Sequence, residues 1–287
     1  MASARKRPVM LLVLATGFAV AGCEQPSGQG PGHRSQRLAL SPQQELALGR
    51  EAYKEILSKA RVLPASRPEV HRVRGVAERI VHAADIEPLQ REINLQVRGY
   101  RFEWEVNVLE SRQINAFCLP GGKMAVFSGI LPVAENDDQL ATVMSHEISH
   151  ALAHHASERL ARQQMIEHAR DVIAGGIGQM DGGERNRFLG VLAAGAGLGA
   201  KSYDRAQESE ADHIGLFLMT FAGYDPDEAV RFWRRMQQAA ANQPRPPEIL
   251  SDHPSDARRV AQLQAWVPYA KAAKKQFDEG RIAPPGR

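Results

Sequence analysis

The chain has 287 residues, of which 43% are hydrophobic and 24% are charged. This length and composition allow a sizeable buried core in one large or two small domains, and they exclude a chain that is disordered throughout. The formal net charge is +3, and residues 1–22 alone carry three basic and no acidic side chains. The remainder has no excess of basic residues, so its charge gives no reason to expect nucleic-acid binding.

Residues 1–23 have the pattern of a secretory signal. Three basic residues, Arg5 to Arg7, precede the apolar run Val9–Val20, which is too short to cross a bilayer as a mature helix. The ending Val20-Ala21-Gly22-Cys23 resembles a bacterial lipoprotein signal, in which the cysteine after the cleavage site is acylated. An ordinary signal peptide that ends near a cysteine is the alternative. Because the chain has only two cysteines, one at this position favours the lipoprotein interpretation.

We therefore expect residues 1–22 to be removed and residues 23–40, rich in Gly, Pro, Ser and Gln, to form a lipid-anchored flexible tether. Glu24 resembles an outer-membrane sorting signal, so we expect the protein to face the periplasm from the outer membrane. With Cys23 acylated, Cys118 is the other thiol and no intramolecular disulfide can form. The sequence gives no indication of the oligomeric state.

The first part of the folded domain is predicted to hold two helices, a strand and a hairpin. Ser41 and Pro42 are a cap and a first residue typical of a helix, which is predicted to reach residue 60, and a second helix is predicted over 68–84. Residues 100–109 alternate between apolar and polar side chains, which predicts a half-buried strand. Two apolar runs within 114–129 flank Pro-Gly-Gly and predict a hairpin.

The next predicted helix begins near Asn136, runs to about Met165 and carries the motif His146-Glu147-x-x-His150. Two histidines four residues apart lie on one helical face and can bind a metal ion together, with the glutamate between them as a base. A histidine-rich, solvent-exposed helix is the alternative. His154 and His155 are predicted to be solvated or to lie behind a ligand.

A catalytic zinc takes three protein ligands, so the two histidines need a partner. Glu208 and Asp212 are four residues apart on a predicted helix over 204–222. Glu208 can supply an anionic oxygen ligand, while Asp212 can accept the outer N–H of a ligand histidine. A helix face with salt bridges is the alternative for this segment alone.

Two more helices are predicted over 225–241 and 255–275, followed by a disordered tail over 278–287. The Gly- and Ala-rich residues 171–200 are predicted to form a mobile, partly helical cover, with a membrane-touching segment or a tightly packed helix as alternatives. His168 and His213 are interpreted as structural, and Tyr203 as a packing residue. Residues 41–277 are predicted to form the folded domain.

Four motifs between about residues 45 and 265 resemble those of the Ste-type and Oma-type zinc metallopeptidases of peptidase family M48. They are Asn115-Ala116-Phe117 with Pro120-Gly121-Gly122, His146-Glu147-x-x-His150, Glu208-x-Glu210-Ala211-Asp212, and His253-Pro254 with Arg259. The absence of predicted transmembrane spans resembles the periplasmic, soluble-domain branch of the family. The absence of a helical repeat array separates the chain from the branch that carries one.

The resemblance implies a gluzincin fold: an α+β, mainly helical metallopeptidase domain with a small antiparallel sheet and an edge strand beside the active-site helix. It implies one zinc ion held by His146, His150 and Glu208. Glu147 is implied as catalytic base, with Asp212 and Arg259 behind the ligands. It also places His253 near the metal, as a fourth ligand in a latent form or as an oxyanion stabiliser in an active one.

The expected function is a zinc-dependent endopeptidase that cleaves misfolded or extended envelope proteins by attack of an activated water, with Glu147 as general base. The substrate is expected to align on the edge formed by Asn115, Ala116 and Phe117. One alternative is a lipid-anchored chaperone or outer-membrane assembly factor whose zinc is locked and whose proteolysis is vestigial. Another is a hydrolase of a different amide, such as a peptidoglycan cross-link.

Overall fold

A computed structural model describes residues 36–95, 99–174, 205–241, 247–253 and 257–281. The predicted signal sequence, the predicted lipidation site at Cys23 and most of the predicted tether lie outside these ranges. So do Tyr203 and nearly all of the predicted Gly- and Ala-rich cover. Within the described ranges, every helix is too short or too polar to cross a membrane.

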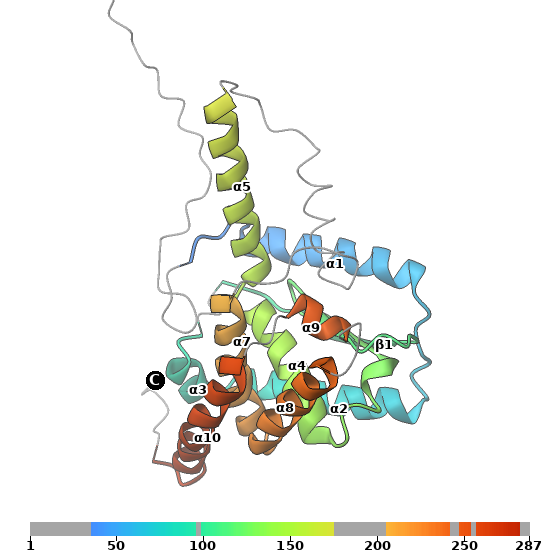
Figure 1. The fold of residues 1–287 in the computed structure, drawn as a ribbon, viewed down its shortest axis with the longest axis vertical. Coiled ribbons are helices and arrows are strands. Elements are labelled where there is room, and N and C mark those ends of the chain that lie inside the picture. The colour runs from blue at the N-terminus through green and yellow to red at the C-terminus, as the bar shows by residue number, and fades with distance from the viewer. Residues whose placement is uncertain (1–35, 96–98, 175–204, 242–246, 254–256, 282–287) are drawn as a thin grey trace, which may run out of the picture.

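The described part of the chain is mainly helical with one small sheet (Figure 1), as the fold class predicts. Its elements are α1 (Pro42–Lys59), α2 (Pro68–Ala84), α3 (Glu87–Glu92), β1 (Glu105–Leu109), β2 (Ala116–Leu119), β3 (Lys123–Phe127), the 3-10 turn η2 (Ser128–Ile130), α4 (Asp137–Leu152), α5 (His155–Ala174), α7 (Arg205–Phe221), α8 (Asp227–Ala241), α9 (Glu248–Asp252) and α10 (Ala257–Asp278). The short helices α3 and α9 were not predicted from the sequence.

Local signals set the ends of the first helices. Ser41 and Gln44 form a capping box at the start of α1, in which each side chain bonds the other residue's backbone N–H. Helix α2 begins at Pro68 and ends at Ala84, the bounds predicted from its apolar face. The side chain of Asn136 caps α4 by accepting a hydrogen bond from the backbone of Gln139.

The sheet has the strand order β1-β3-β2. It was expected to be antiparallel, but it is mixed. The hairpin turn places β3 antiparallel to β2 and between β2 and β1, which leaves β1 parallel to β3. Strand β1 is also shorter than predicted. Before the strand, the backbone N–H of Glu103 donates to the carbonyl of Gly121 in the hairpin turn, and the N–H of Glu105, the first residue of β1, donates to that of Gly122.

Strand β2 lies at the edge of this sheet and packs against α4, as the resemblance to the family implies. Its four residues are all buried. Asn115, just before the strand, is fully buried, and its side-chain oxygen accepts a hydrogen bond from the backbone of Ala116. The edge is therefore held in a fixed position beside the central helix.

The predicted helix from Asn136 to Met165 is wrong, because it is two helices with a break at His154. This residue has φ of 55°, a left-handed conformation that ends α4, and α5 starts directly after it. Nδ1 of His154 lies 2.9 Å from Oε2 of the buried Glu45 in α1, and its ring stacks on Tyr100 at 3.6 Å. Contacts with distant parts of the chain thus fix the break. His154 is buried rather than solvated.

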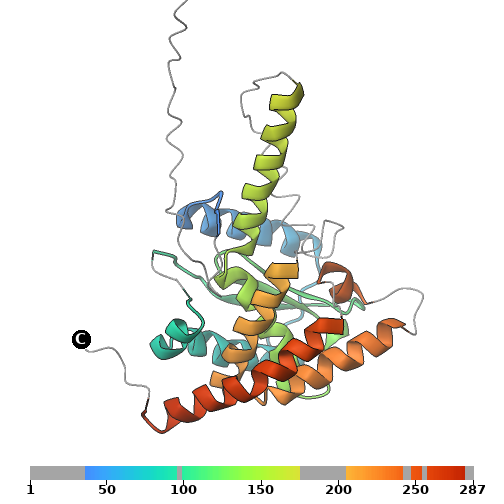
Figure 2. The same cartoon turned by 60° about the vertical axis from the view of Figure 1, so that its left-hand side comes forward.

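Helices α4 and α7 pack face to face at the centre, with α2, α8 and α10 around them. Figure 2 shows α8 and α10 side by side and α5 projecting away from this group. Gly215 lets α4 and α7 approach closely. A Cβ atom at this position would lie 3.0 Å from the backbone nitrogen of His146.

We expect Gly215→Val to destabilise the protein by about 1–3 kcal/mol, because the added methyl groups must push α7 away from the backbone of α4. Thermal unfolding measures the effect. Gly75→Ala is the control, since a Cβ on this exposed glycine of α2 meets nothing within 4 Å, and it should stabilise by about 0.5–1 kcal/mol. Equal melting temperatures for Gly215→Val and the wild type would contradict the close approach.

Candidate metal centre

His146 and His150 lie one turn apart on the side of α4 that faces α7. Both are buried, and their Nε2 atoms are 3.1 Å apart. Nδ1 of His146 lies 2.9 Å from Oδ1 of Asp212 in α7. The Nε2 atoms of the two rings therefore face a common point between α4 and α7.

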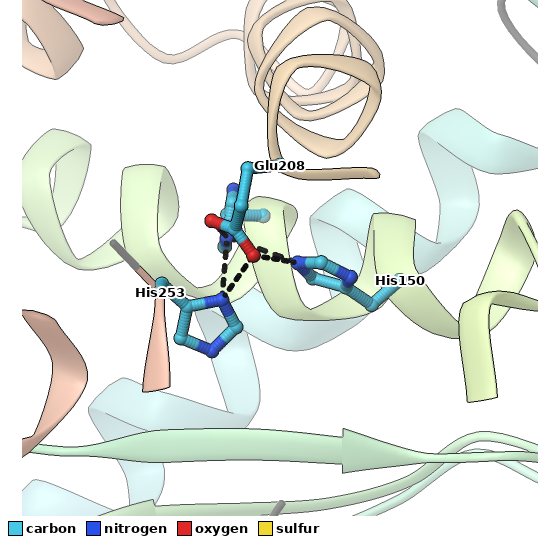
Figure 3. A group of neighbouring side chains, drawn as sticks. His150, Glu208 and His253 are labelled. Atoms are coloured by element: carbon cyan, nitrogen blue, oxygen red, sulfur yellow. Dashed lines mark hydrogen bonds and ion pairs between the residues drawn. The ribbon is translucent and has the colours of Figure 1, made fainter. Parts of the chain in front are cut away.

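Glu208, near the start of α7, brings a carboxylate to the same point. Its Oε2 is 3.4 Å from Nε2 of His146, and its Oε1 is 3.5 Å from Nε2 of His150. Figure 3 shows Glu208 and His150 pointing toward one another from their separate helices. The structure thus places Glu208 beside the two histidines of H-E-x-x-H.

His253 follows α9 and completes the group. Its Nδ1 lies 2.9 Å from Oε1 of Glu208 and 3.1 Å from Nε2 of His146, and Figure 3 shows the ring beside the carboxylate. Its Nε2 lies 3.3 Å from Oε1 of Glu147. The structure therefore brings together the three predicted ligands, His253 and the predicted base Glu147.

The four donor groups fit a zinc ion. One donor atom from each of His146, His150, Glu208 and His253 lies within 4.8 Å of the others, and all four residues are buried. Zinc bonds imidazole nitrogen at about 2.0–2.1 Å, so the donors of a tetrahedral site are roughly 3.3 Å apart. The nitrogen–nitrogen distances of 3.1 Å are close to this spacing. Imidazole nitrogens with a carboxylate oxygen are ligands that suit zinc.

The buried donors of the group shift one another's pKa values. Burial raises the pKa of the Glu208 carboxyl, but the imidazoles of His253 and His146 outweigh it and hold that pKa well below its ordinary value. Burial and the charge of Arg259 lower the pKa of His146, yet hydrogen bonds to Asp212 and Glu208 raise it to about 9. Burial, followed by the charge on His146, holds the pKa of His150 well below its ordinary value.

Asp212 lies behind His146, and Arg259 contacts both Asp212 and the donor Glu208, with Nη1 of Arg259 3.5 Å from Oε2 of Glu208. Nη2 of Arg259 donates to Oδ1 of Asp212 at 2.5 Å, and Asp212 also contacts Nδ1 of His146. The guanidinium group of Arg259 lies 3.4 Å from the ring centre of the buried Trp233. The ring of Trp233 thus packs against Arg259 in a cation–π contact, which the sequence alone did not indicate.

Other predicted residues have separate positions. His213 packs against Phe217 and Trp266, as a structural histidine would. Cys118 is a buried free thiol in β2, and burial, followed by the negative charge of Glu147, raises its pKa well above the ordinary value. His155 is fully buried and contacts His150, which excludes the solvated alternative. The side chain of His168 lies outside the described residues.

A helix with H-E-x-x-H beside an edge strand, together with a glutamate from a second helix, defines a zincin-type metallopeptidase of the gluzincin kind. A comparison of the sequence with protein families supports this class. The model of peptidase family M48 matches residues 78–267, so the chain belongs to this family of zinc metalloproteases.

Relatives of the chain are found in mitochondria and in bacteria. It is 33% identical over 239 residues to mitochondrial metalloendopeptidase OMA1 of Schizosaccharomyces pombe. The aligned region covers 82% of this chain and 64% of the relative. It is 32% identical over 255 residues to the protein of that name in Saccharomyces cerevisiae, with coverage of 85% and 70%.

A bacterial relative is the beta-barrel assembly-enhancing protease of Escherichia coli K12. It is 32% identical over 159 residues, which are 54% of this chain and 32% of the relative. The chain therefore spans just under two thirds of the Schizosaccharomyces protein and about a third of the Escherichia protein.

Proposed function

We propose that the chain is a zinc-dependent endopeptidase that cleaves misfolded or extended proteins of the cell envelope, with Glu147 as general base. The position of Glu147 carries the proposal. It is buried and lies between His146 and His150 in the sequence of α4. Its Oε1 is 3.3 Å from Nε2 of His253. A general base beside the metal promotes hydrolysis, whereas a site that only binds metal does not need one.

The chain's own residues would divide the work between them. His146, His150 and Glu208 would hold zinc, which supplies a Lewis acid that polarises the scissile carbonyl and acidifies a water molecule. The carboxylate of Glu147 would accept a proton from that water and later return it to the leaving amine. Asp212 would keep the proton of His146 on Nδ1, so that Nε2 faces the metal.

The substrate would bind along β2. This strand pairs with β3 on one side and is the edge of the described sheet, beside the helix that carries Glu147. An extended peptide can add to Asn115, Ala116 and Phe117 through main-chain hydrogen bonds that tolerate varied side chains. Such binding selects unfolded or extended segments over folded domains.

The proposed location rests on the sequence. The lipoprotein-like signal predicts removal of residues 1–22, a lipid on Cys23 and a periplasm-facing domain over 41–277. The relation to a protein named beta-barrel assembly-enhancing protease supports an envelope setting. Polypeptides in the envelope are the proposed substrates.

A second candidate function comes from the closed state of the site. His253 contributes a fourth donor, whereas catalytic zinc sites keep one position open for water or substrate. Four protein donors around the centre therefore favour a latent form. In that form the protein would act as a zinc-locked, lipid-anchored chaperone or assembly factor until His253 moves away.

Casein hydrolysis separates the two functions. With the full chain in detergent and zinc present, we expect cleavage that stops when a chelator is added. His253→Ala should cleave several-fold faster than the wild type, because it frees the fourth position. A wild type that is inactive while His253→Ala cleaves casein would establish the latent form. A loss of about 10²-fold or more in His253→Ala would show that His253 stabilises the oxyanion instead.

A further inference from the structure

Three side chains from three helices form a line that ends at the metal centre. Oε2 of Glu210 in α7 lies 3.0 Å from Nε2 of His155 at the start of α5. Nδ1 of His155 lies 2.8 Å from Nδ1 of His150 in α4. All three residues are buried, and His155 has no exposed surface. The proposed base, ligands and edge strand do not account for this line.

The line has a defined order of donors and acceptors. The carboxylate of Glu210 is an acceptor, so Nε2 of His155 carries the proton of that contact. Nδ1 of a neutral His155 is then an acceptor, and the N–H in the 2.8 Å contact belongs to Nδ1 of His150. This tautomer leaves the lone pair of His150 on Nε2, the atom that faces His146 and Glu208.

His146 is held in the same tautomer by a shorter route. Its Nδ1 contacts the carboxylate of Asp212 directly at 2.9 Å. Asp212 and Glu210 both belong to α7, as does Glu208. Helix α7 therefore supplies three carboxylates. Glu208 reaches the centre itself, and Asp212 contacts His146 directly. Glu210 acts on His150 through His155.

The break at His154 makes the second route possible. In a continuous helix, residues five positions apart lie about 140° apart around the axis, so the two rings could not meet. The left-handed turn at His154, with φ of 55°, redirects the chain and brings His155 back against His150. The contact between His154 and Glu45 holds this turn in place.

We propose that His155 and Glu210 are positioning residues that fix the ring orientation and tautomer of His150, so that its Nε2 is presented to the metal. This inference rests on the proposed zinc site. The inference is tested by metal affinity rather than by peptidase activity. It can therefore be wrong even if the proposed peptidase function is right. Residues of this kind change metal affinity by about 10–100-fold when they are lost.

The matched pair His155→Leu and His155→Asn tests the acceptor. Oδ1 of asparagine is as many bonds from Cα as Nδ1 of histidine, and it can accept the N–H of His150, whereas leucine fills the space without an acceptor. Zinc dissociation constants are measured on the full chain by competition with a chromophoric chelator. We expect His155→Leu to bind about 10–100-fold more weakly than the wild type and His155→Asn to stay within about threefold.

Two further measurements separate positioning from a merely structural role. Visible absorption of the Co²⁺-loaded protein reports the ligand geometry, and it should change in His155→Leu but not in His155→Asn. Thermal unfolding of the chelated proteins shows whether each variant is folded. If His155→Leu does not fold, Glu210→Leu compared with Glu210→Gln carries the test, because glutamine keeps an acceptor for His155 and leucine does not.

The proposal is overturned if His155→Leu and Glu210→Leu bind zinc as tightly as the wild type and give its Co²⁺ spectrum. It is also overturned if leucine and asparagine at position 155 weaken binding equally. A wild-type chain that binds no zinc would remove the proposed function itself, a result distinct from these two. His213→Leu is the control, since His213 packs on Phe217 and Trp266, and it should leave zinc affinity unchanged.

Discussion

Replacing Glu147 with glutamine is expected to reduce kcat for casein by about 10²–10⁴-fold, the usual contribution of a general acid or base. Glutamine has the size of glutamate and can still accept the contact from His253, but it cannot take a proton from water. The substitution is buried and isosteric, so the packing of α4 should not change. Zinc content and melting temperature should therefore match those of the wild type.

The measurement is single-substrate kinetics with zinc content determined on the same samples. Glu158→Gln is the matched control: Glu158 is also a buried carboxylate, but it accepts a hydrogen bond from Gln207 and supplies no donor to the metal group. Its kcat should stay near that of the wild type. Cleavage at the wild-type rate by zinc-loaded Glu147→Gln would refute the proposed mechanism.

Glu208→Gln is expected to weaken zinc binding by more than about 100-fold, which exceeds the effect of losing a residue behind a ligand. The change keeps an oxygen at the site but removes the negative charge that the centre contributes to a divalent cation. Casein cleavage should disappear at equimolar zinc and return in part when zinc is in excess. Chelator competition measures the affinity, and the zinc dependence of the rate measures the rescue.

Asp212→Asn gives the comparison for this result. Asp212 contacts His146 and Arg259 and supplies no donor to the centre, so its loss should weaken zinc binding by about 10–100-fold. The expected order is thus wild type, then Asp212→Asn, then Glu208→Gln. Equal affinity in Glu208→Gln and the wild type would exclude Glu208 as a ligand.

Local sequence signals were enough for the elements that depend on neighbours in the chain. The capping residues at Ser41 and the apolar face of α2 predict helices whose observed bounds match closely. The metal group was also predictable, since His146 with His150 and Glu208 with Asp212 each follow the spacing of one helix. His253 has no such spacing, and its position came from the resemblance to the family alone.

Features that depend on distant contacts could not be predicted. The break at His154 arises because Glu45 and Tyr100 hold its ring, and no residue beside it in the chain is a helix breaker. The parallel pairing of β1 with β3 depends on which strand the hairpin places in the middle. The sequence allows His155 to be either solvated or behind a ligand, because its contact with His150 exists only when α4 ends before it.

The metal group joins parts of the chain that are far apart in sequence. His146 and His253 are 107 residues apart, and Glu208 and His253 are 45 residues apart. A bound ion would join these segments, and because the unfolded chain has no preformed site, its binding free energy would add to the free energy of unfolding. In a chain whose buried Cys118 is a free thiol, the zinc centre would take the stabilising role that disulfides have in many secreted proteins.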